Sequence, residues 1–129
     1  AGEDAPGEMP RYELGELPEG FVENLESQFV GTGMTAHFYE NEKGDVILFE
    51  YIYMQQGSLS GVNTENAYVI SVIVNDCEGL LVIPKEEDSN SMLMWLDPEH
   101  DLQFTLDAPL GQEDILHMAE SVHLVETMK

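Results

Sequence analysis

Apolar and polar residues alternate along the last third of the chain with the period of a β-strand. Leu102, Phe104 and Leu106 are separated by single polar residues, so they face one side of an extended segment. An apolar run at 92–96 precedes them, and the intervening sequence DPEHD has the proline and aspartate residues that favour a tight turn. The pattern therefore predicts a hairpin over residues 92–107.

The period changes to that of a helix after Pro109. Four apolar residues share one side of a helix that we expect over 112–122: Ile115, Met118, Ala119 and Val122. Gly111 is the candidate N-cap, and Glu113 and Asp114 place negative charge at the positive end of the helix dipole. A helix of about three turns is not stable alone, so we expect its apolar side to pack on a sheet.

A second hairpin is predicted in the first half of the chain. Its arms are residues 35–40 and 46–54, and Gly44 in the polar turn between them can adopt a positive φ. The second arm is almost entirely β-branched, aromatic or aliphatic. We therefore expect it to be a central strand that is covered on both faces.

The remaining strands have shorter or weaker patterns. Residues 67–74 are strongly β-prone, 75–79 have turn composition with Cys77 inside the turn, and 80–84 form the next strand. A weakly patterned first strand is expected over 22–30, after an irregular segment with Pro18 and Gly20.

These elements predict an α+β fold. We expect a mostly antiparallel sheet of about six or seven strands, connected as a meander, with a C-terminal helix packed on one face. Residues 1–10 contain glycine, proline and acidic residues but almost no apolar ones, so they are predicted to be a flexible acidic linker or tail. Residues 11–129 then form a single domain.

The charge of the chain is strongly negative. Lysine and arginine number 4 against 26 aspartates and glutamates, which gives a formal net charge of −22. Phosphate backbones and anionic membrane surfaces would be repelled, so we expect no nucleic-acid binding. Cationic partners or divalent ions would be attracted, and solubility alone is a simpler explanation of the same surface.

The cysteine content and the apolar runs bear on the location of the protein. The single cysteine, Cys77, cannot form an intramolecular disulfide, which fits a reducing compartment or an extracytoplasmic bacterial protein with few disulfides. No apolar run is long enough to cross a membrane. Because the chain begins at Ala1 without methionine, we expect a membrane anchor, if there is one, to lie upstream of this sequence.

The metal-ligating residue types do not form a recognised motif. The histidines are scattered without zinc-site spacing, and His117 is expected on the helix surface: His37, His100, His117 and His123. Two acidic groups, Glu40, Glu42 and Asp45 and then Glu86, Glu87 and Asp88, could offer oxygen ligands to calcium but lack the EF-hand pattern. No metal or cofactor is therefore predicted.

Catalytic signatures are equally weak. Cys77 lies between Asp76 and Glu78, and nearby negative charge makes a thiol a poorer nucleophile. Three serines lack the His–Asp setting that would make them nucleophiles: Ser58, Ser60 and Ser121. With so many acids, a carboxylate pair for glycoside cleavage carries no information. We predict that the chain is not an enzyme.

Aromatic and methionine side chains suggest one candidate binding feature. Residues from the predicted strands and helix could line an apolar groove under the helix: Phe49, Tyr51, Trp95, Phe104, Ile115 and Met118. The alternative is that these residues form the hydrophobic core, which is the commoner use of such side chains.

Several segments together resemble a known bacterial family. The motif LPEGF at 17–21 and the helix sequence DILHMAESV at 114–122 carry the resemblance, with FY at 38–39, FE at 49–50 and the last hairpin. They are similar to a bacterial domain of unknown function, family 4367. The resemblance implies an extracytoplasmic domain of Gram-positive bacteria, commonly placed after one membrane span, without established catalytic residues. It also implies a wider likeness to the curved sheets of lipoprotein-carrier and sigma-regulator periplasmic domains.

Three functional hypotheses follow. The first is a non-enzymatic extracytoplasmic module of a membrane-tethered bacterial protein that senses or contacts a partner protein at the cell surface. The second is a carrier or sensor of an apolar, lipid-like or lipoprotein-like ligand that is held between helix and sheet. The third is a hydrolase without a readable signature.

Overall fold

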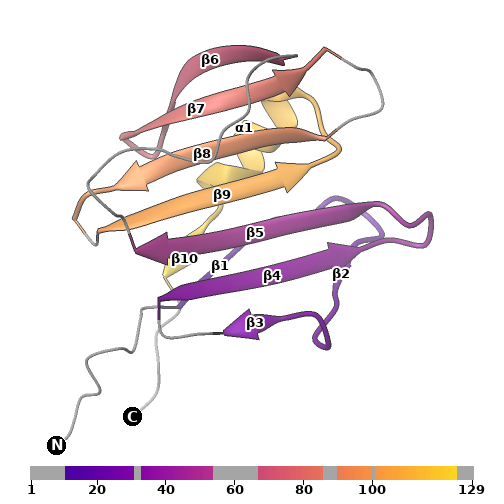
Figure 1. The fold of residues 1–129 in the computed structure, drawn as a ribbon. Coiled ribbons are helices and arrows are strands. Elements are labelled where there is room, and N and C mark those ends of the chain that lie inside the picture. The colour runs from indigo at the N-terminus through magenta and orange to yellow at the C-terminus, as the bar shows by residue number, and fades with distance from the viewer. Residues whose placement is uncertain (1–10, 31–32, 54–66, 86–89, 100, 125–129) are drawn as a thin grey trace, which may run out of the picture.

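The computed structural model describes residues 11–30, 33–53, 67–85, 90–99 and 101–124 (Figure 1). In chain order the elements are β1 (Tyr12–Glu13), β2 (Val22–Glu23), β3 (Phe29–Val30), β4 (Met34–Glu40), β5 (Val46–Tyr53), β6 (Ala67–Val74), β7 (Cys77–Pro84), β8 (Ser91–Asp97), β9 (Leu102–Ala108), α1 (Gln112–Glu120) and β10 (His123–Leu124). The predicted linker at 1–10 lies outside the described residues.

The main sheet contains eight of the described strands in the order β2-β4-β5-β9-β8-β7-β6, with β3 also paired to β4. Every pair is antiparallel. The predicted α+β class, with a mostly antiparallel sheet and a C-terminal helix, is confirmed. The strands β4 to β9 are seven or eight residues long, whereas β2 and β3 have two residues each.

The predicted meander is wrong at one connection. β6 follows β5 in the chain but lies at the opposite edge of the sheet, and β9 takes the place beside β5. The strands from β6 to β9 then form a meander that returns to β5 (Figure 1). Apolar residues face one another across this long-range pair, as Phe49 does with Leu106 and Tyr51 with Phe104. Cross-strand pairs of this kind stabilise a sheet.

The strand expected over 22–30 is also corrected. The segment pairs with β4 only at its two ends, and a turn separates β2 from β3. The Asn24 side chain accepts a hydrogen bond from the Glu26 N–H at 3.0 Å, and the Asn24 carbonyl accepts one from the Ser27 N–H at 3.1 Å. Asparagine side chains favour such local turns over an uninterrupted ladder.

The turn expected at 75–79 is shorter than predicted. Only Asn75 and Asp76 form it, with φ of 49° and 71°. Cys77 already belongs to β7, where it pairs with Val74. Asparagine and aspartate tolerate positive φ, and two such residues match the twist of a tight hairpin. The turn at Gly44, with φ of 90°, is as predicted.

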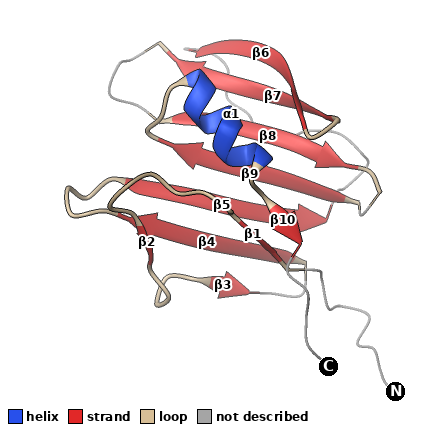
Figure 2. Ribbon diagram, turned by 180° about the vertical axis from the view of Figure 1, so that it is seen from behind, coloured by secondary structure: helices blue, strands red, loops and turns tan. Residues whose placement is uncertain are grey.

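One face of the sheet is covered by α1 and by a ribbon in which β1 pairs with β10 (Figure 2). The helix packs over β8, β9 and β6. Tyr12 of the ribbon contacts the rings of Tyr51 and Phe104, so β1 lies over β5 and β9. Alternate side chains of the long strands fill the layer between the sheet and its cover, which gives the molecule a single core on this face.

The helix ends two residues earlier than predicted, at Glu120. Ser121 ends it: its hydroxyl donates to the Met118 carbonyl, and its Oγ accepts hydrogen bonds from the N–H groups of Gly15 and Glu16, each at 3.1 Å. One side chain thus joins the helix end to the segment that follows β1.

Replacing Ser121 with alanine is expected to reduce the free energy of unfolding by about 1 kcal/mol, because these hydrogen bonds are lost near the surface. Urea denaturation would measure the change. Ser71→Ala, at an exposed serine of β6, is the matched control and should have little effect. Equal midpoints for the two variants would contradict this role of Ser121.

Candidate functional site

The structure brings the six predicted groove residues together in the hydrophobic core. Four come from the central strands and two from the side of α1 that faces them, and their exposed fractions lie between 0 and 3%: Phe49, Tyr51, Trp95, Phe104, Ile115 and Met118. Trp95 stacks on Phe104 with 5.1 Å between ring centroids. A ligand between helix and sheet would have to displace packed side chains, which is costly in a close-packed interior.

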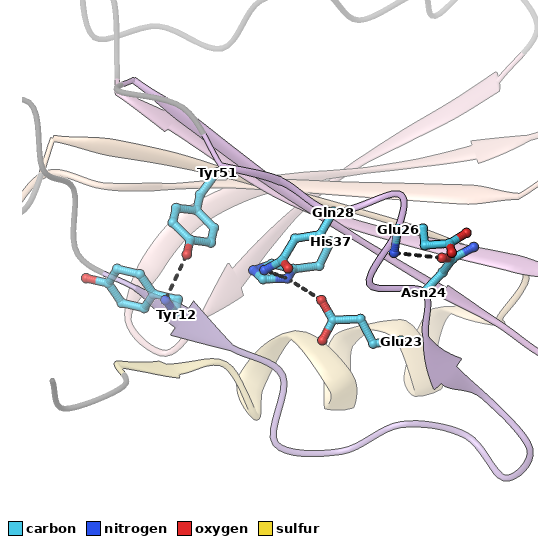
Figure 3. A network of polar contacts seen from close by, with 7 residues as sticks. All are labelled: Tyr12, Glu23, Asn24, Glu26, Gln28, His37 and Tyr51. Atoms are coloured by element: carbon cyan, nitrogen blue, oxygen red, sulfur yellow. Dashed lines mark hydrogen bonds and ion pairs between the residues drawn. The ribbon is translucent and has the colours of Figure 1, made fainter. Parts of the chain in front are cut away.

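A buried histidine marks the other end of the same face. The ring of His37 is stacked on Phe49 with 6.1 Å between centroids, and its exposed fraction is 6%. Its Nδ1 lies 2.7 Å from Oε2 of Glu23 and 3.4 Å from Nε2 of Gln28 (Figure 3). A buried imidazole requires such partners. Glu23 comes from β2, and Gln28 lies immediately before β3.

The contact between His37 and Glu23 was not predicted from the sequence. Thr35, His37 and Tyr39 alternate along one strand, so their spacing alone could have placed His37 on the inner face beside Tyr39. A polar residue in such a position indicates a buried partner. Burial, followed by the charges of Glu23 and Glu13 and by Tyr51, raises the pKa of the Tyr39 hydroxyl well above its usual range.

Two of the candidate calcium ligands, Asp45 and Glu40, accept side-chain hydrogen bonds. Asp45 accepts from the side-chain amide of Asn41, and Glu40 accepts from that of Asn24, each at 3.1 Å. Glu86, Glu87 and Asp88 lie outside the described residues, as do His100, Ser58 and Ser60. Among the residues that are described, no three histidine, cysteine or acidic side chains are grouped as metal ligands. His117 lies at the helix surface, as predicted, with its Nε2 2.7 Å from Glu16.

Cys77 lies partly buried at the start of β7. Burial, followed by the nearby charges of Asp97, Asp76 and Glu99, raises the pKa of its thiol. A raised pKa lowers the thiolate fraction near neutral pH, and the thiolate is the reactive form.

Alkylation of Cys77 by iodoacetamide at pH 8 is therefore expected to be slower in the native protein than in the urea-unfolded protein. Added salt should speed the native reaction, because it screens the surrounding carboxylates. Free cysteine under the same conditions controls for direct salt effects on the reagent. A native rate that equals the unfolded rate and ignores salt would contradict the influence of these acids.

The second face of the sheet points away from α1 and is also largely apolar. Residues that pair across neighbouring strands share a face, so a continuous row crosses the sheet from β4 to β6: Ala36, Glu50, Thr105, Met94, Leu80 and Ser71. Partial burial raises the pKa of the Glu50 carboxyl on this face.

A hollow of about 460 Å³ lies on the second face, over the β6–β7 hairpin and the end of β8. Its walls include Ile73, Leu80 and Leu96, with Ser71 and Glu78 as polar members. This hollow was not predicted from the sequence, because its residues come from three strands whose registers depend on the fold. Within the described residues, this hollow, rather than the predicted groove, has room for another group.

A family model matches residues 11–122, which include every long strand and the helix. Its description is domain of unknown function, DUF4367. The chain belongs to this family. No curated protein and no solved structure matches the chain. Within the described part of this DUF4367 domain, no helix combines the length and apolar character needed to cross a membrane.

Proposed function

We propose that this domain is a non-enzymatic sensing or interaction module. We place it outside the cytoplasm of a bacterial cell, tethered to the surface through a part of the protein beyond this sequence. The observation that carries the proposal is the position of its exposed large apolar side chains. Six of the nine in the described residues gather at the two edges of the sheet: Val22, Leu25 and Phe29 at one edge, and Tyr68, Val69 and Ile73 at the other. Apolar groups clustered on a surface mark interaction sites.

The net charge of the chain indicates which kinds of partner would be attracted. A net charge of −22 favours cationic partners and repels nucleic acids and anionic membranes. The packed core supports contact at the surface rather than enclosure of a ligand, because the helix and sheet already fill the space between them. The partner is therefore expected to be a protein that offers both apolar and basic groups.

A carrier or sensor of an apolar, lipid-like ligand is the alternative function. The hollow beside Leu80 and Leu96 supports it, because a short apolar group would fit there. Native mass spectrometry of the domain purified from its host distinguishes the two. A carrier should retain a small apolar molecule in a fixed ratio, whereas an interaction module should have the mass of its chain alone.

Photo-cross-linking in the host cell tests the interaction function. A photoreactive amino acid would be placed in the full-length protein at one exposed apolar position at a time: Leu25, Phe29, Tyr68 or Ile73. At least one position is expected to give a discrete protein adduct. Glu113 on the exposed side of α1 is the control position and should give none. If no apolar position gives more adduct than Glu113, the interaction function is wrong.

A further inference from the structure

We propose that the free edge of β6 is a docking site for one extended, basic segment of another protein, which adds to the sheet as a further strand. The proposal rests on the interaction function above and names its site and partner chemistry. In the part of the chain that the structure describes, β6 pairs only with β7. The opposite edge differs, since β4 is covered there by β2 and β3.

The β6 edge lacks the features that usually protect an edge strand. Its sequence, AYVISVIV, contains no charged residue and no proline, and all eight of its residues pair with β7 in continuous register, without a bulge. Natural sheets normally block long apolar edges of this kind with lysine, proline or a bulge. Tyr68, Val69 and Ile73 are exposed by 61, 43 and 58%. As far as the described residues extend, the edge is therefore open to pairing along its length.

The tight turn sets which backbone groups face outward. Asn75 and Asp76 form a two-residue hairpin, and the residues that flank such a turn form a hydrogen-bonded pair. Counting back in twos from Val74, one set of residues directs its N–H and C=O groups at β7. The other set directs these groups at the free edge: Ala67, Val69, Ser71 and Ile73. An added strand would bond to these four residues.

The hollow on the second face begins at this same edge. Ser71 and Ile73 contribute both outward backbone groups and part of its wall, and Leu80 and Leu96 form its apolar floor. An apolar side chain of the added strand, directed to the second face, would lie at the hollow. Backbone pairing combined with a place for alternate side chains is a known mode of peptide recognition.

The charged residues near β6 indicate which kind of segment would bind there. Asp76 and Glu78 lie at the hairpin end of the edge, and Asp97 and Glu99 are near enough to act on Cys77 beside them. At the other end, the Lys85 ammonium lies 5.2 Å from the centre of the Tyr68 ring. A segment with basic residues near the hairpin fits this edge. A second copy of the chain fits less well, because two bodies of charge −22 repel each other.

A display library of random decapeptides, panned on the intact chain, tests the proposal. Enriched peptides are expected to be basic, with apolar residues at alternate positions. A fluorescently labelled enriched peptide should then bind the native chain and lose at least tenfold in affinity for Ser71→Pro. Proline at Ser71 removes an outward N–H without removing a bond to β7. Ser71→Ala is the matched control and should bind as the native chain does.

Variants of the peptide test the same backbone pairing with the protein unchanged, so that a folding defect of a protein variant does not affect the result. N-methylation of one alternate set of peptide amides should abolish binding, and methylation of the other set should not, because an edge strand uses only every second amide. Equal effects of both sets, or binding that falls with salt but is unchanged in Ser71→Pro, would overturn the proposal. Failure to enrich basic peptides would overturn it as well.

Two further results would distinguish the proposed site and partner from the alternatives. Analytical ultracentrifugation that shows a dimer abolished by Ser71→Pro would identify a second copy as the occupant and overturn the choice of a basic partner. Cross-links in the cell from Leu25 or Phe29, but none from Tyr68 or Ile73, would overturn the β6 site and leave the interaction function intact.

Discussion

Replacing Phe104 with alanine is expected to lower the free energy of unfolding by about 3 to 5 kcal/mol. Its ring is at the centre of an aromatic cluster, with centroid distances of 5.0 Å to Tyr12, 5.1 Å to Trp95, 5.7 Å to Tyr51 and 6.1 Å to Phe49. The substitution removes contacts to β1, β5 and β8 at once and leaves a cavity between rigid rings. Denaturation in urea would measure the loss.

The fluorescence of Trp95 reports the same substitution independently. Trp95 is the only tryptophan and stacks directly on Phe104, so its emission should shift to the red as water gains access. Phe29→Ala is the matched control, because Phe29 is exposed by 52% and lies in an edge strand. It should cost about 1 kcal/mol or less. Similar losses in the two variants would contradict a core centred on Phe104.

The elements that could be predicted are those with a strong local period. Alternation at 102–107 identified the last hairpin, and a polar turn before a β-prone run identified the hairpin of β4 and β5. The change to helical spacing near Pro109 identified α1, whose Ile115 and Met118 face the core as expected. The helix end was misplaced because Val122 continues the apolar spacing, whereas the Ser121 hydroxyl bonds to Met118 and to the segment after β1. The spacing of apolar residues carries no information about such a long-range contact.

The strand order could not be predicted, because pairing is decided between segments that are distant in the chain. Both β6 and β9 offer apolar residues for pairing, and nothing in the local sequence of Phe49 or Tyr51 distinguishes β9 from β6 as a partner of β5. The position of β6 at an edge, on which the proposed docking site depends, follows from this choice. The sequence patterns therefore predicted the strands that form the docking site but not the position of those strands in the sheet.

For the candidate groove, too, the sequence could not decide between two structures. Aromatic residues on facing elements are compatible with a groove or with a core, and the distance between helix and sheet decides between them. Ala119 is fully buried in α1, and a small residue lets the helix approach the sheet closely. The space is consequently filled by Trp95, Phe104 and Ile115 themselves.

Replacing Gly79 with alanine is expected to be strongly destabilising. The result also tests where the proposed docking site lies. Gly79 lies in β7 opposite Trp95, although its sequence neighbourhood suggested a turn. A Cβ at this position would lie 2.6 Å from the carbonyl oxygen of Met94 and 2.9 Å from the Cβ of Trp95. Both are too close, and a backbone atom cannot move aside as a flexible side chain does. We expect a loss of about 2 to 3 kcal/mol in the free energy of unfolding.

Gly111→Ala separates this steric effect from the general effect of replacing glycine. Gly111 has a φ of −72°, and no atom lies within 4 Å of a Cβ built there. Its replacement should change stability by less than about 1 kcal/mol, because the smaller entropy of the unfolded chain offsets a weaker N-cap. If Gly79→Ala proved as mild as Gly111→Ala, β7 and β8 could not be as close as the register of Gly79 with Trp95 requires. The floor of the hollow, which Leu80 and Leu96 form beside that pair, would then be placed incorrectly.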